Sequence, residues 1–243
     1  MAKQGIPLVD VLVITYDRLE VLTKTWRALK GRLHYPNLRW VIADDHSPDD
    51  VAVAMREELQ PDIFFRTRKR SGWGINVNNA LKNLTSEFVF QVEDDYVLKS
   101  RHIDLMPGVD ILARFPEFGM VRYGGIGGHD LTCRYRQIEA MPSAIFDKAP
   151  TRYQIWEILK KESHFLFVYS HAPHLKHRRF HTAYGYYAEG YKMGLTEEAF
   201  AHRFRDVQDG PSIFVLPEFV SSGFVHVGKT RQHTKHDIGK EHP

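Results

Sequence analysis

Two short groups of acidic residues stand directly after apolar runs of the sequence. The pair Asp44–Asp45 ends one such run, and the triplet Glu93–Asp95 follows the run at 88–92. Adjacent carboxylates repel one another, so their burial is costly unless a positive group compensates them. Carboxylate oxygens are the ligands that hard cations such as Mg²⁺ and Mn²⁺ prefer. The triplet therefore predicts either a metal site or a solvated acidic turn.

Two features favour the metal site. No turn residue separates the triplet from its apolar run, and the other acidic run end precedes it by about fifty positions. One or two protein carboxylates leave a cation short of ligands, and the diphosphate of a nucleotide would supply the others.

Alternating patterns in the first half of the chain predict the elements that position these acids. Nearly continuous aliphatic runs predict buried strands at 8–16, 38–45, 62–66 and 88–92. Apolar spacing and helix-end signals predict helices at 18–31, 47–61 and 76–84. This repetition predicts an α/β fold with an open, mostly parallel sheet flanked by helices. Ligands bind at the carboxyl ends of the strands in such sheets, and both acidic groups fall there.

The second half of the chain has less regular patterns. We expect strands at 119–123, 164–170, 212–218 and 222–228, and helices at 151–162 and 196–206. Residues 171–181 contain four histidines, which we interpret as part of a basic loop rather than a zinc site. The polar, basic residues 229–243 predict a tail or an active-site flap. No repeat or linker divides the chain, so we expect one compact domain.

Composition limits the class of protein. The 243 residues carry a net charge of +3 and a single cysteine, Cys133, which excludes an internal disulfide and fits a reducing compartment. No apolar run approaches the roughly 20 residues of a membrane span, and the N-terminus lacks the apolar region of a signal peptide. We therefore expect a cytoplasmic protein without a membrane span. The mild positive charge suits an anionic ligand.

Three stretches of the sequence resemble a known family. In order, VLVITYDR, RWVIADDHSPDD and RSGWGINVNNALKNLTSEFVFQVEDDYVL resemble the nucleotide-sugar-binding half of GT-A-fold glycosyltransferases, particularly those of family 2. The resemblance implies a GT-A type, Rossmann-like mixed sheet and a single catalytic domain at 1–228. Within it, the nucleotide-sugar-binding half is 1–100 and the acceptor-binding half is 101–228, with 229–243 as the tail or flap.

The same resemblance implies an enzymatic activity. The protein is expected to be a metal-dependent, inverting hexosyl- or pentosyltransferase that moves a sugar from a nucleotide-diphospho sugar to an acceptor hydroxyl. Its expected cofactor is Mn²⁺ or Mg²⁺, and its expected donor substrate is the nucleotide sugar.

The resemblance also assigns contacts to individual residues. Those implied to bind the donor are Thr15, Tyr16, Asp17, Asp44, Asp45, Gly72, Asn78, Glu93, Asp94 and Arg179. The acidic triplet takes the place of the family's Asp-x-Asp motif, and Asp95 is implied to ligate the metal directly. Glu93 stands where aspartate is usual, so it is either a further metal ligand or a ribose contact. His226 is implied to complete the metal or diphosphate site.

An acidic pair in the second half corresponds to the family's catalytic acids. Glu197 and Glu198 lie at the start of a predicted helix, and the resemblance implies that Glu198 is the general base that deprotonates the acceptor hydroxyl. Glu197 and Glu189 are the alternative bases. All three residues are equally typical of acids that stabilise the N-terminus of a helix. The segment 171–181 would face the acceptor.

Two other functions compete with this one. A nucleotidyltransferase shares a similar sheet and metal-binding carboxylates, but a Gly-rich basic loop usually follows its first strand, where this chain has TYDRLEVL. A nucleic-acid-binding module is favoured by the basic segments 66–70 and 174–181 and by the tail, and disfavoured by the acidic strand ends. The acceptor is left open between a saccharide, a lipid and a modified base in DNA.

Overall fold

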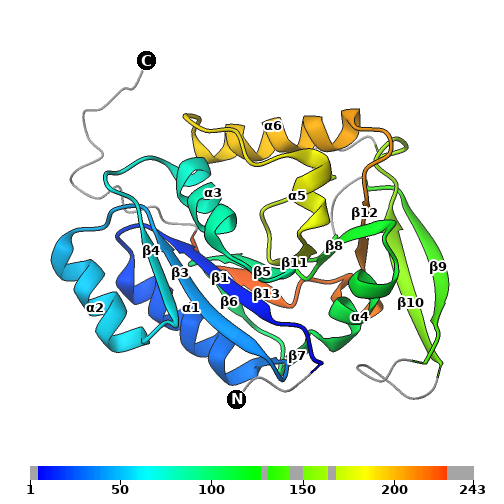
Figure 1. Ribbon diagram of the computed structural model, residues 1–243, viewed down its shortest axis with the longest axis horizontal. Helices are drawn as coiled ribbons and strands as arrows, with labels where there is room; N and C mark the ends of the chain where they lie inside the picture. Colours follow the sequence, from blue (N-terminus) through cyan, green and yellow to red (C-terminus); the bar gives the residue numbers. More distant parts are fainter. Residues whose placement is uncertain (1–4, 127–130, 143–149, 164–167, 229–243) are drawn as a thin grey trace.

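The chain forms an α/β fold around one mixed sheet. The computed structural model describes residues 5–126, 131–142, 150–163 and 168–228. Over these residues the sheet has nine strands in the order β4-β3-β1-β5-β11-β8-β12-β10-β9 (Figure 1). The predicted class, an open mixed sheet flanked by helices, is confirmed. The predicted tail at 229–243 lies outside the described residues.

The first half of the chain builds a parallel half-sheet. Its strands, in spatial order, are β4 (Ile63–Arg66), β3 (Leu38–Asp44), β1 (Val9–Thr15) and β5 (Phe88–Glu93). The strands predicted in this half are therefore confirmed. Every residue of β1 and of β5 is buried, which explains the unbroken aliphatic runs.

Helices cover both faces of the sheet. They are α1 (Leu19–Arg32), α2 (Asp49–Leu59), α3 (Trp73–Asn83), α4 (Met106–Arg114), α5 (Arg179–Tyr184) and α6 (Met193–Asp206). Figure 1 shows α3, α5 and α6 on one side of the sheet and α1, α2 and α4 on the other. The helices predicted at 18–31, 47–61, 76–84 and 196–206 are confirmed.

The second half of the chain continues the sheet with mixed directions. Its strands are β11 (His174–His177), β8 (Phe118–Arg122), β12 (Ser212–Val215), β10 (Thr151–Ile158) and β9 (Cys133–Ala140). β11 is antiparallel to β5 and to β8, β12 is parallel to β8, and β10 and β9 close the edge as an antiparallel pair.

Three predictions in this half are corrected. The helix predicted at 151–162 is the strand β10, because its side chains alternate between the two faces of the sheet and pair with β9 and β12. The loop predicted at 171–181 is mostly β11 and α5. Of the strand predicted at 164–170, only 168–170 is described, and these residues form no strand.

Two small sheets and a short helix complete the fold. β6 (Tyr96–Leu98) pairs with β13 (Phe224–His226), and β2 (Leu33–His34) pairs with β7 (Ile103–Asp104). The 3₁₀ helix η1 (Pro217–Phe219) precedes β13. The β6–β13 pair matters for the site, because it returns the end of the described chain to the acidic triplet.

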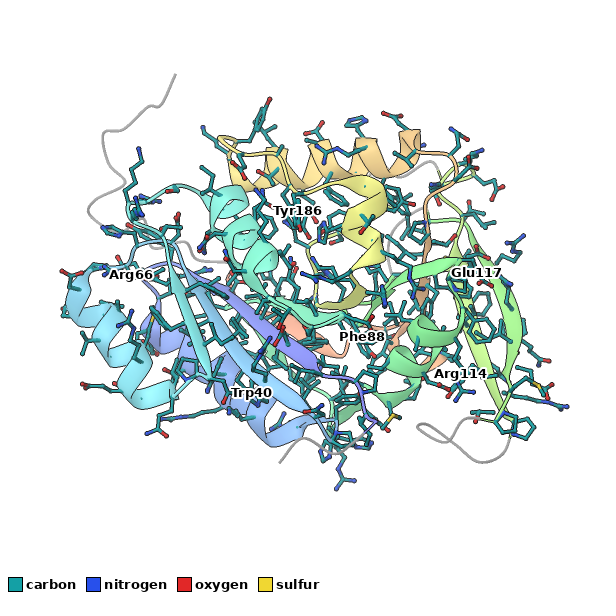
Figure 2. The ribbon with its side chains drawn as sticks, viewed as in Figure 1. Trp40, Arg66, Phe88, Arg114, Glu117 and Tyr186 are labelled. Atoms are coloured by element: carbon teal, nitrogen blue, oxygen red, sulfur yellow. The ribbon has the colours of Figure 1, made fainter. Side chains whose placement is uncertain are left out.

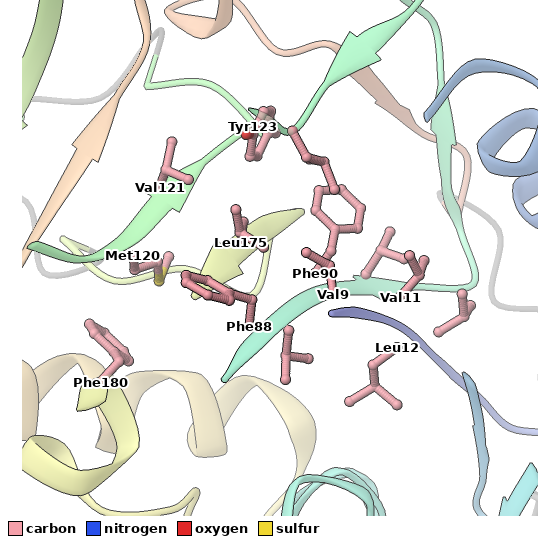
Figure 3. Packing of buried hydrophobic residues seen from close by; sticks show 14 of the residues in the cluster. Val9, Val11, Leu12, Phe88, Phe90, Met120, Val121, Tyr123, Leu175 and Phe180 are labelled. Atoms are coloured by element: carbon pink, nitrogen blue, oxygen red, sulfur yellow. The ribbon is translucent and has the colours of Figure 1, made fainter. Parts of the chain in front are cut away.

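The hydrophobic core is continuous across both halves of the sheet. Figure 3 shows its central part, in which side chains of β1, β5, β8, β11 and α5 pack together; the labelled residues are Val9, Val11, Leu12, Phe88, Phe90, Met120, Val121, Tyr123, Leu175 and Phe180. This packing fixes β5 at the centre, with its acidic end at one edge of the sheet. None of the described helices is both long and apolar enough to cross a membrane.

Candidate functional site

The register of the parallel strands brings both acidic groups to the same end of the sheet, where the carboxyl ends of these strands lie. Thr15, the last residue of β1, pairs with Asp44 of β3, and Ile14 pairs with Glu93 of β5. The carboxyl ends of the three strands therefore lie side by side, as expected for a ligand site in a sheet of this kind.

Asp44 holds the turn that follows β3. Its buried carboxylate accepts hydrogen bonds from the backbone N–H of Ser47, at 3.1 and 3.2 Å, and from the Ser47 hydroxyl. Arg66, labelled in Figure 2, stands at the end of β4. Its Nε lies 3.4 Å from the same carboxylate. Burial raises the pKa of Asp44, and these contacts oppose that shift. Asp44 is thus fully engaged in the loop between β3 and α2.

Asp45 holds the segment that leads into α3. Its carboxylate accepts hydrogen bonds from the backbone N–H groups of Ser71, at 2.9 Å, and Gly72, at 2.8 Å. The Thr67 hydroxyl donates a third at 3.2 Å. Gly72 precedes α3 with a φ of +88°, a conformation that favours glycine. Gly72 therefore presents its backbone to Asp45, and both residues border the site.

The residues after β1 turn around the edge of the sheet. The Thr15 hydroxyl donates to Asp94 Oδ2 at 2.7 Å, so this side chain faces the acidic triplet. The backbone N–H of Asp17, a residue with a positive φ of 49°, donates to the Ser47 hydroxyl at 2.8 Å. The Tyr16 ring lies under the guanidinium of Arg70. Tyr16 and Asp17 are therefore at the edge shared by β1 and β3.

The positive group that compensates the triplet is Arg18. Its Nε donates to Asp94 Oδ2 at 3.1 Å, its Nη2 contacts Asp94 Oδ1, and its Nη1 donates to Asp95 Oδ2 at 3.0 Å. Burial raises the pKa of Asp94 to about 6, against the opposing effect of Arg18, so Asp94 is ionised at neutral pH. Sequence reasoning missed Arg18, although it directly follows the TYD stretch at the end of the first strand.

Asp95 and His226 lie together because β6 pairs with β13. His226 Nε2 is 3.4 Å from Asp95 Oδ2, and the His226 ring stacks on Tyr96 with a centroid distance of 4.7 Å. The backbone N–H of Val227 donates to the Asp95 carbonyl at 2.8 Å. Asp95 Oδ1 is buried and has no hydrogen-bond partner. The predicted pair of metal ligands is thus brought together, with one carboxylate oxygen unused.

Glu93 faces the opposite side of the triplet. Its Oε1 is buried without a hydrogen-bond partner and lies 3.8 Å from His171 Nδ1. Burial and the neighbouring Asp95 and Asp94 raise the pKa of Glu93 well above its usual range. Burial lowers the pKa of His171 well below its usual range, so the contact joins a carboxyl group to a neutral imidazole. The His171 ring stacks on Trp73, with 3.9 Å between the centroids.

Of the acids in the second half of the chain, Glu197 reaches this group. Glu197 Oε1 accepts a hydrogen bond from the backbone N–H of His171 at 2.7 Å. Glu198, the base predicted from sequence, instead lies 3.8 Å from His202 Nε2, and its side chain is 43% exposed. The two residues point in different directions because neighbours on a helix are about 100° apart.

Glu189 and Asn78 form a separate hydrogen-bonded group. Asn78 Nδ2 donates to Glu189 Oε1 at 2.8 Å and to the Tyr187 carbonyl at 2.9 Å, and Asn78 Oδ1 accepts from the Tyr187 N–H at 3.1 Å. Lys82 lies 3.6 Å from the same Glu189 oxygen. Asn78 thus fixes the segment at 187–189 to α3.

Arg179 lies at the opposite end of the strands, near the start of β5. His177 pairs with Phe88 at the start of β5, and Arg179 follows two residues later. Its Nη1 donates to the carbonyls of Phe115 and Phe118, at 3.3 and 3.2 Å. The structure therefore does not bring Arg179 together with the other residues predicted to bind the donor.

The segment predicted as a basic loop is largely buried. Lys176 is 1% exposed and donates to Gln91 Oε1 at 2.5 Å and to the Tyr187 hydroxyl at 3.1 Å. His174 and His181 are also buried. Burial lowers the pKa of all three groups well below their usual ranges. These three side chains therefore belong to the core rather than to a basic surface, because β11 crosses the middle of the sheet, whereas Arg178 is exposed.

Two side chains of the site have the chemistry of metal ligands. Within the described ranges, no group of three or more His, Cys, Asp or Glu residues is placed to hold a metal ion. Asp95 and His226 offer one carboxylate and one imidazole. The carboxylate suits Mn²⁺ or Mg²⁺, and the buried, unpartnered Asp95 Oδ1 has unused ligand capacity.

The arrangement of the fold and site defines the class of protein. The mixed sheet, the acidic triplet at the end of its central parallel strand and the helices on both faces are those of a GT-A fold, and solved structures with this fold match the chain. One is S. aureus TarS 1-349 in complex with UDP, with a TM-score of 0.60 and 17% identity. The match covers 89% of this chain and 59% of the TarS chain.

Two further structures show the same likeness. S. aureus TarS 1-349 in complex with UDP-GlcNAc has a TM-score of 0.58 and 18% identity, over 92% of this chain and 61% of that one. The mannosyltransferase PcManGT from Pyrobaculum calidifontis, in complex with GDP-Man and Mn²⁺, has a TM-score of 0.53 and 17% identity, over 87% and 57%. The chain thus spans about 60% of the length of these proteins.

The family match lies in the first half of the chain. Residues 10–107 match the model of glycosyl transferase family 2, and this segment contains β1, both acidic strand ends and Arg18. A search of curated proteins found no match. The resemblance to GT-A-fold, family 2-like glycosyltransferases predicted from the sequence is confirmed.

Proposed function

We propose that this protein is a metal-dependent, inverting glycosyltransferase that moves a sugar from a nucleotide-diphospho sugar to an acceptor hydroxyl. One observation carries the proposal: Asp95, with an unpartnered buried oxygen, lies beside His226 at the carboxyl end of β5, within the segment that matches family 2. The nucleoside would lie over the ends of β1 and β3, bordered by Tyr16, Asp17 and Gly72.

The site fits a divalent cation that the donor helps to bind. Asp95 and His226 would hold Mn²⁺ or Mg²⁺, and the donor's diphosphate would supply further oxygen ligands. When bound, the metal offsets the negative charge that develops on the leaving nucleoside diphosphate. Stacking on Tyr96 holds the His226 ring in place, and the Thr15 hydroxyl holds Asp94, the neighbour of Asp95. Mn²⁺ in the complex of the similar mannosyltransferase supports this choice of metal.

We assign the general base to Glu197 in place of Glu198. A base has to reach the acceptor hydroxyl next to the donor sugar, and Glu197 is the acid of this pair that contacts the His171 backbone beside Glu93. Arg122, buried at the carboxyl end of β8, interacts electrostatically with Glu197. The Glu197 carboxylate would accept the proton of the acceptor hydroxyl as the hydroxyl oxygen attacks the anomeric carbon and the nucleoside diphosphate leaves.

A pair of matched variants tests the base. We expect Glu197→Gln to lower kcat by a factor of about 10²–10⁴ while donor binding persists, because only proton removal is lost. Glu198→Gln serves as the control and should keep nearly full turnover. Loss of turnover in Glu198→Gln with normal activity in Glu197→Gln would return the assignment to Glu198.

Binding of the donor tests the function itself. We expect one of the nucleotides UDP, GDP and CDP, or its sugar, to bind in calorimetry with Mn²⁺ present and much more weakly with the metal removed. If none of them or their sugars binds with Mn²⁺ present, the proposed function is wrong.

The acceptor is proposed only as a hydroxyl of a saccharide, a lipid or a modified base in DNA. The DNA alternative and the nucleic-acid-binding module lose part of one support, because His174, Lys176 and His181 of segment 174–181 are buried. The nucleotidyltransferase alternative gains no support. It would have a Gly-rich loop after the first strand, and the short turn at 16–18 contains no glycine.

A further inference from the structure

Arg18 is the built-in cation of the acidic triplet. It directly precedes α1, and three nitrogen atoms of its guanidinium contact the two carboxylates of the turn that follows β5. The contacts are unevenly divided. Asp94 receives Nε and Nη2 as a fork, whereas Asp95 receives only Nη1.

The two aspartates differ in what else is open to them. Asp94 is fully buried, and besides the Arg18 fork it accepts a hydrogen bond from the Thr15 hydroxyl. Asp95 shares Oδ2 between Arg18 Nη1 and His226 Nε2 and leaves Oδ1 without a partner. Arg18 can therefore release Asp95 and still keep its paired contact with Asp94.

Gly228 keeps the space next to these groups free of a side chain. A Cβ atom at this position would collide with Asp95 Oδ2 and would lie 3.2 Å from His226 Nε2. Both the Arg18 guanidinium, at 3.0 Å, and the His226 imidazole, at 3.4 Å, lie close to Asp95 Oδ2.

We propose that Arg18 competes with the divalent cation for Asp95 and thereby sets the metal affinity of the site. The proposal rests on the metal-dependent function proposed above. A guanidinium 3.0 Å from Asp95 Oδ2 repels a second cation and occupies one of the oxygens that the cation needs. A bound diphosphate offers Arg18 Nη1 another anionic partner. Arg18 therefore keeps metal binding weak in the free protein and couples it to binding of the donor.

The test measures Mn²⁺ binding directly, without turnover. Free Mn²⁺ is followed by electron paramagnetic resonance as it is titrated into the wild-type protein and the Arg18→Gln and Arg27→Gln variants, with and without the nucleoside diphosphate that binds best. Arg27 is exposed on the same helix, so Arg27→Gln removes the same charge away from the triplet. Arg18→Lys keeps a positive charge but loses the fork.

We expect Arg18→Gln to bind Mn²⁺ about tenfold more tightly than the wild type when no nucleotide is present. The gain should shrink once the nucleotide is bound. Arg27→Gln should match the wild type, and Arg18→Lys should lie closer to the wild type than to Arg18→Gln. If Arg18 only stabilises the structure, the opposite is expected. Its replacement would then disorder the triplet, and Mn²⁺ would bind more weakly.

The outcomes separate this proposal from the proposed function. If Mn²⁺ binds the wild type and Arg18→Gln equally, or the variant more weakly, competition by Arg18 is overturned while metal-dependent transfer stands. If Mn²⁺ binds neither protein, even with nucleotide, both fail. Should Arg18→Gln be unfolded without metal, recovery of its circular dichroism spectrum on Mn²⁺ addition supports the proposal, and no recovery overturns it.

Discussion

The two acidic strand ends lie on either side of the carboxyl end of β1 but are stabilised in different ways. At the end of β3, Asp44 and Asp45 are held mainly by hydroxyl and backbone N–H groups from the loops that follow β3 and β4, with Arg66 3.4 Å from Asp44. At the end of β5, the triplet 93–95 depends mainly on charged or ring groups that are distant in sequence. These are Arg18, His171 and His226, and the Thr15 hydroxyl adds a further hydrogen bond.

The pair Asp44–Asp45 therefore shapes the site, whereas the triplet 93–95 has capacity for a ligand. Backbone donors already satisfy Asp45, so its loss would loosen the segment at 67–72. The triplet retains two buried oxygens without hydrogen-bond partners, Glu93 Oε1 and Asp95 Oδ1. Buried polar groups of native proteins are nearly always paired, so two unpaired oxygens in one cluster indicate a place that a ligand completes.

Removal of the Asp95 charge should have the largest effect. Asp95→Asn would remove the carboxylate from the proposed metal site, and a metal ion contributes several kcal/mol to stabilisation of the transition state. We expect kcat to fall by about 100-fold or more, and Mn²⁺ binding to be lost in titrations followed by electron paramagnetic resonance. Asp45→Asn is the matched control and should retain Mn²⁺ binding. Equal loss of Mn²⁺ binding in both variants would contradict the proposed difference between Asp95 and Asp45.

Substitution at Asp45 should act mainly on stability. The amide of Asp45→Asn cannot accept from both Ser71 and Gly72 as the carboxylate does, which leaves one of these partly buried N–H groups unpaired. An unpaired buried group costs about 1–3 kcal/mol, which we expect as the decrease in the free energy of unfolding measured in urea. Asp50→Asn, at an exposed position in the first turn of α2, should change it little. Unchanged stability in Asp45→Asn would mean that its hydrogen bonds do not hold the loop.

The pH dependence of stability tests the state of His171. Its pKa in the folded protein lies well below the usual value of 6.5, so below pH 6.5 the unfolded chain binds a proton that the folded protein does not. His171 should therefore lower the stability by about 1.4 kcal/mol per pH unit as the pH falls from 6.5 toward its folded pKa. This is the smallest effect, because it concerns a single proton.

The measurement compares the wild type with His171→Gln by urea unfolding at several pH values between 7 and 5. Because both proteins share all other titrating groups, the difference between their slopes isolates His171. A slope difference of opposite sign would mean that His171 is protonated and paired with Glu93, and that the triplet has a second internal cation.

Much of the first half of the chain was predictable from local patterns. Unbroken aliphatic runs are typical of strands buried on both faces, and acids directly after them fall at the carboxyl ends of a parallel sheet. The strand β10 was mispredicted because the apolar residues of 151–162 fit a helical spacing as well as alternation. Its pairing with β9 and β12 decided between the two.

The roles of single residues were harder to predict, because they depend on contacts between distant segments. Arg18 and Asp94 are 76 residues apart, so no local pattern links them. Glu197 and Glu198 are equivalent in the sequence, and only the packing of α6 decides which one approaches His171. Basic residues near 176 resemble a surface loop until β11 is seen at the centre of the sheet.

The sequence by itself determined the fold class, the parallel half-sheet and the edge at which its acids gather, because each follows from burial patterns within one element. Only the tertiary structure decided which cation compensates the triplet, which acid faces it and that His226 joins Asp95. Those contacts arise where separate elements meet, and their geometry depends on the packing of the whole chain.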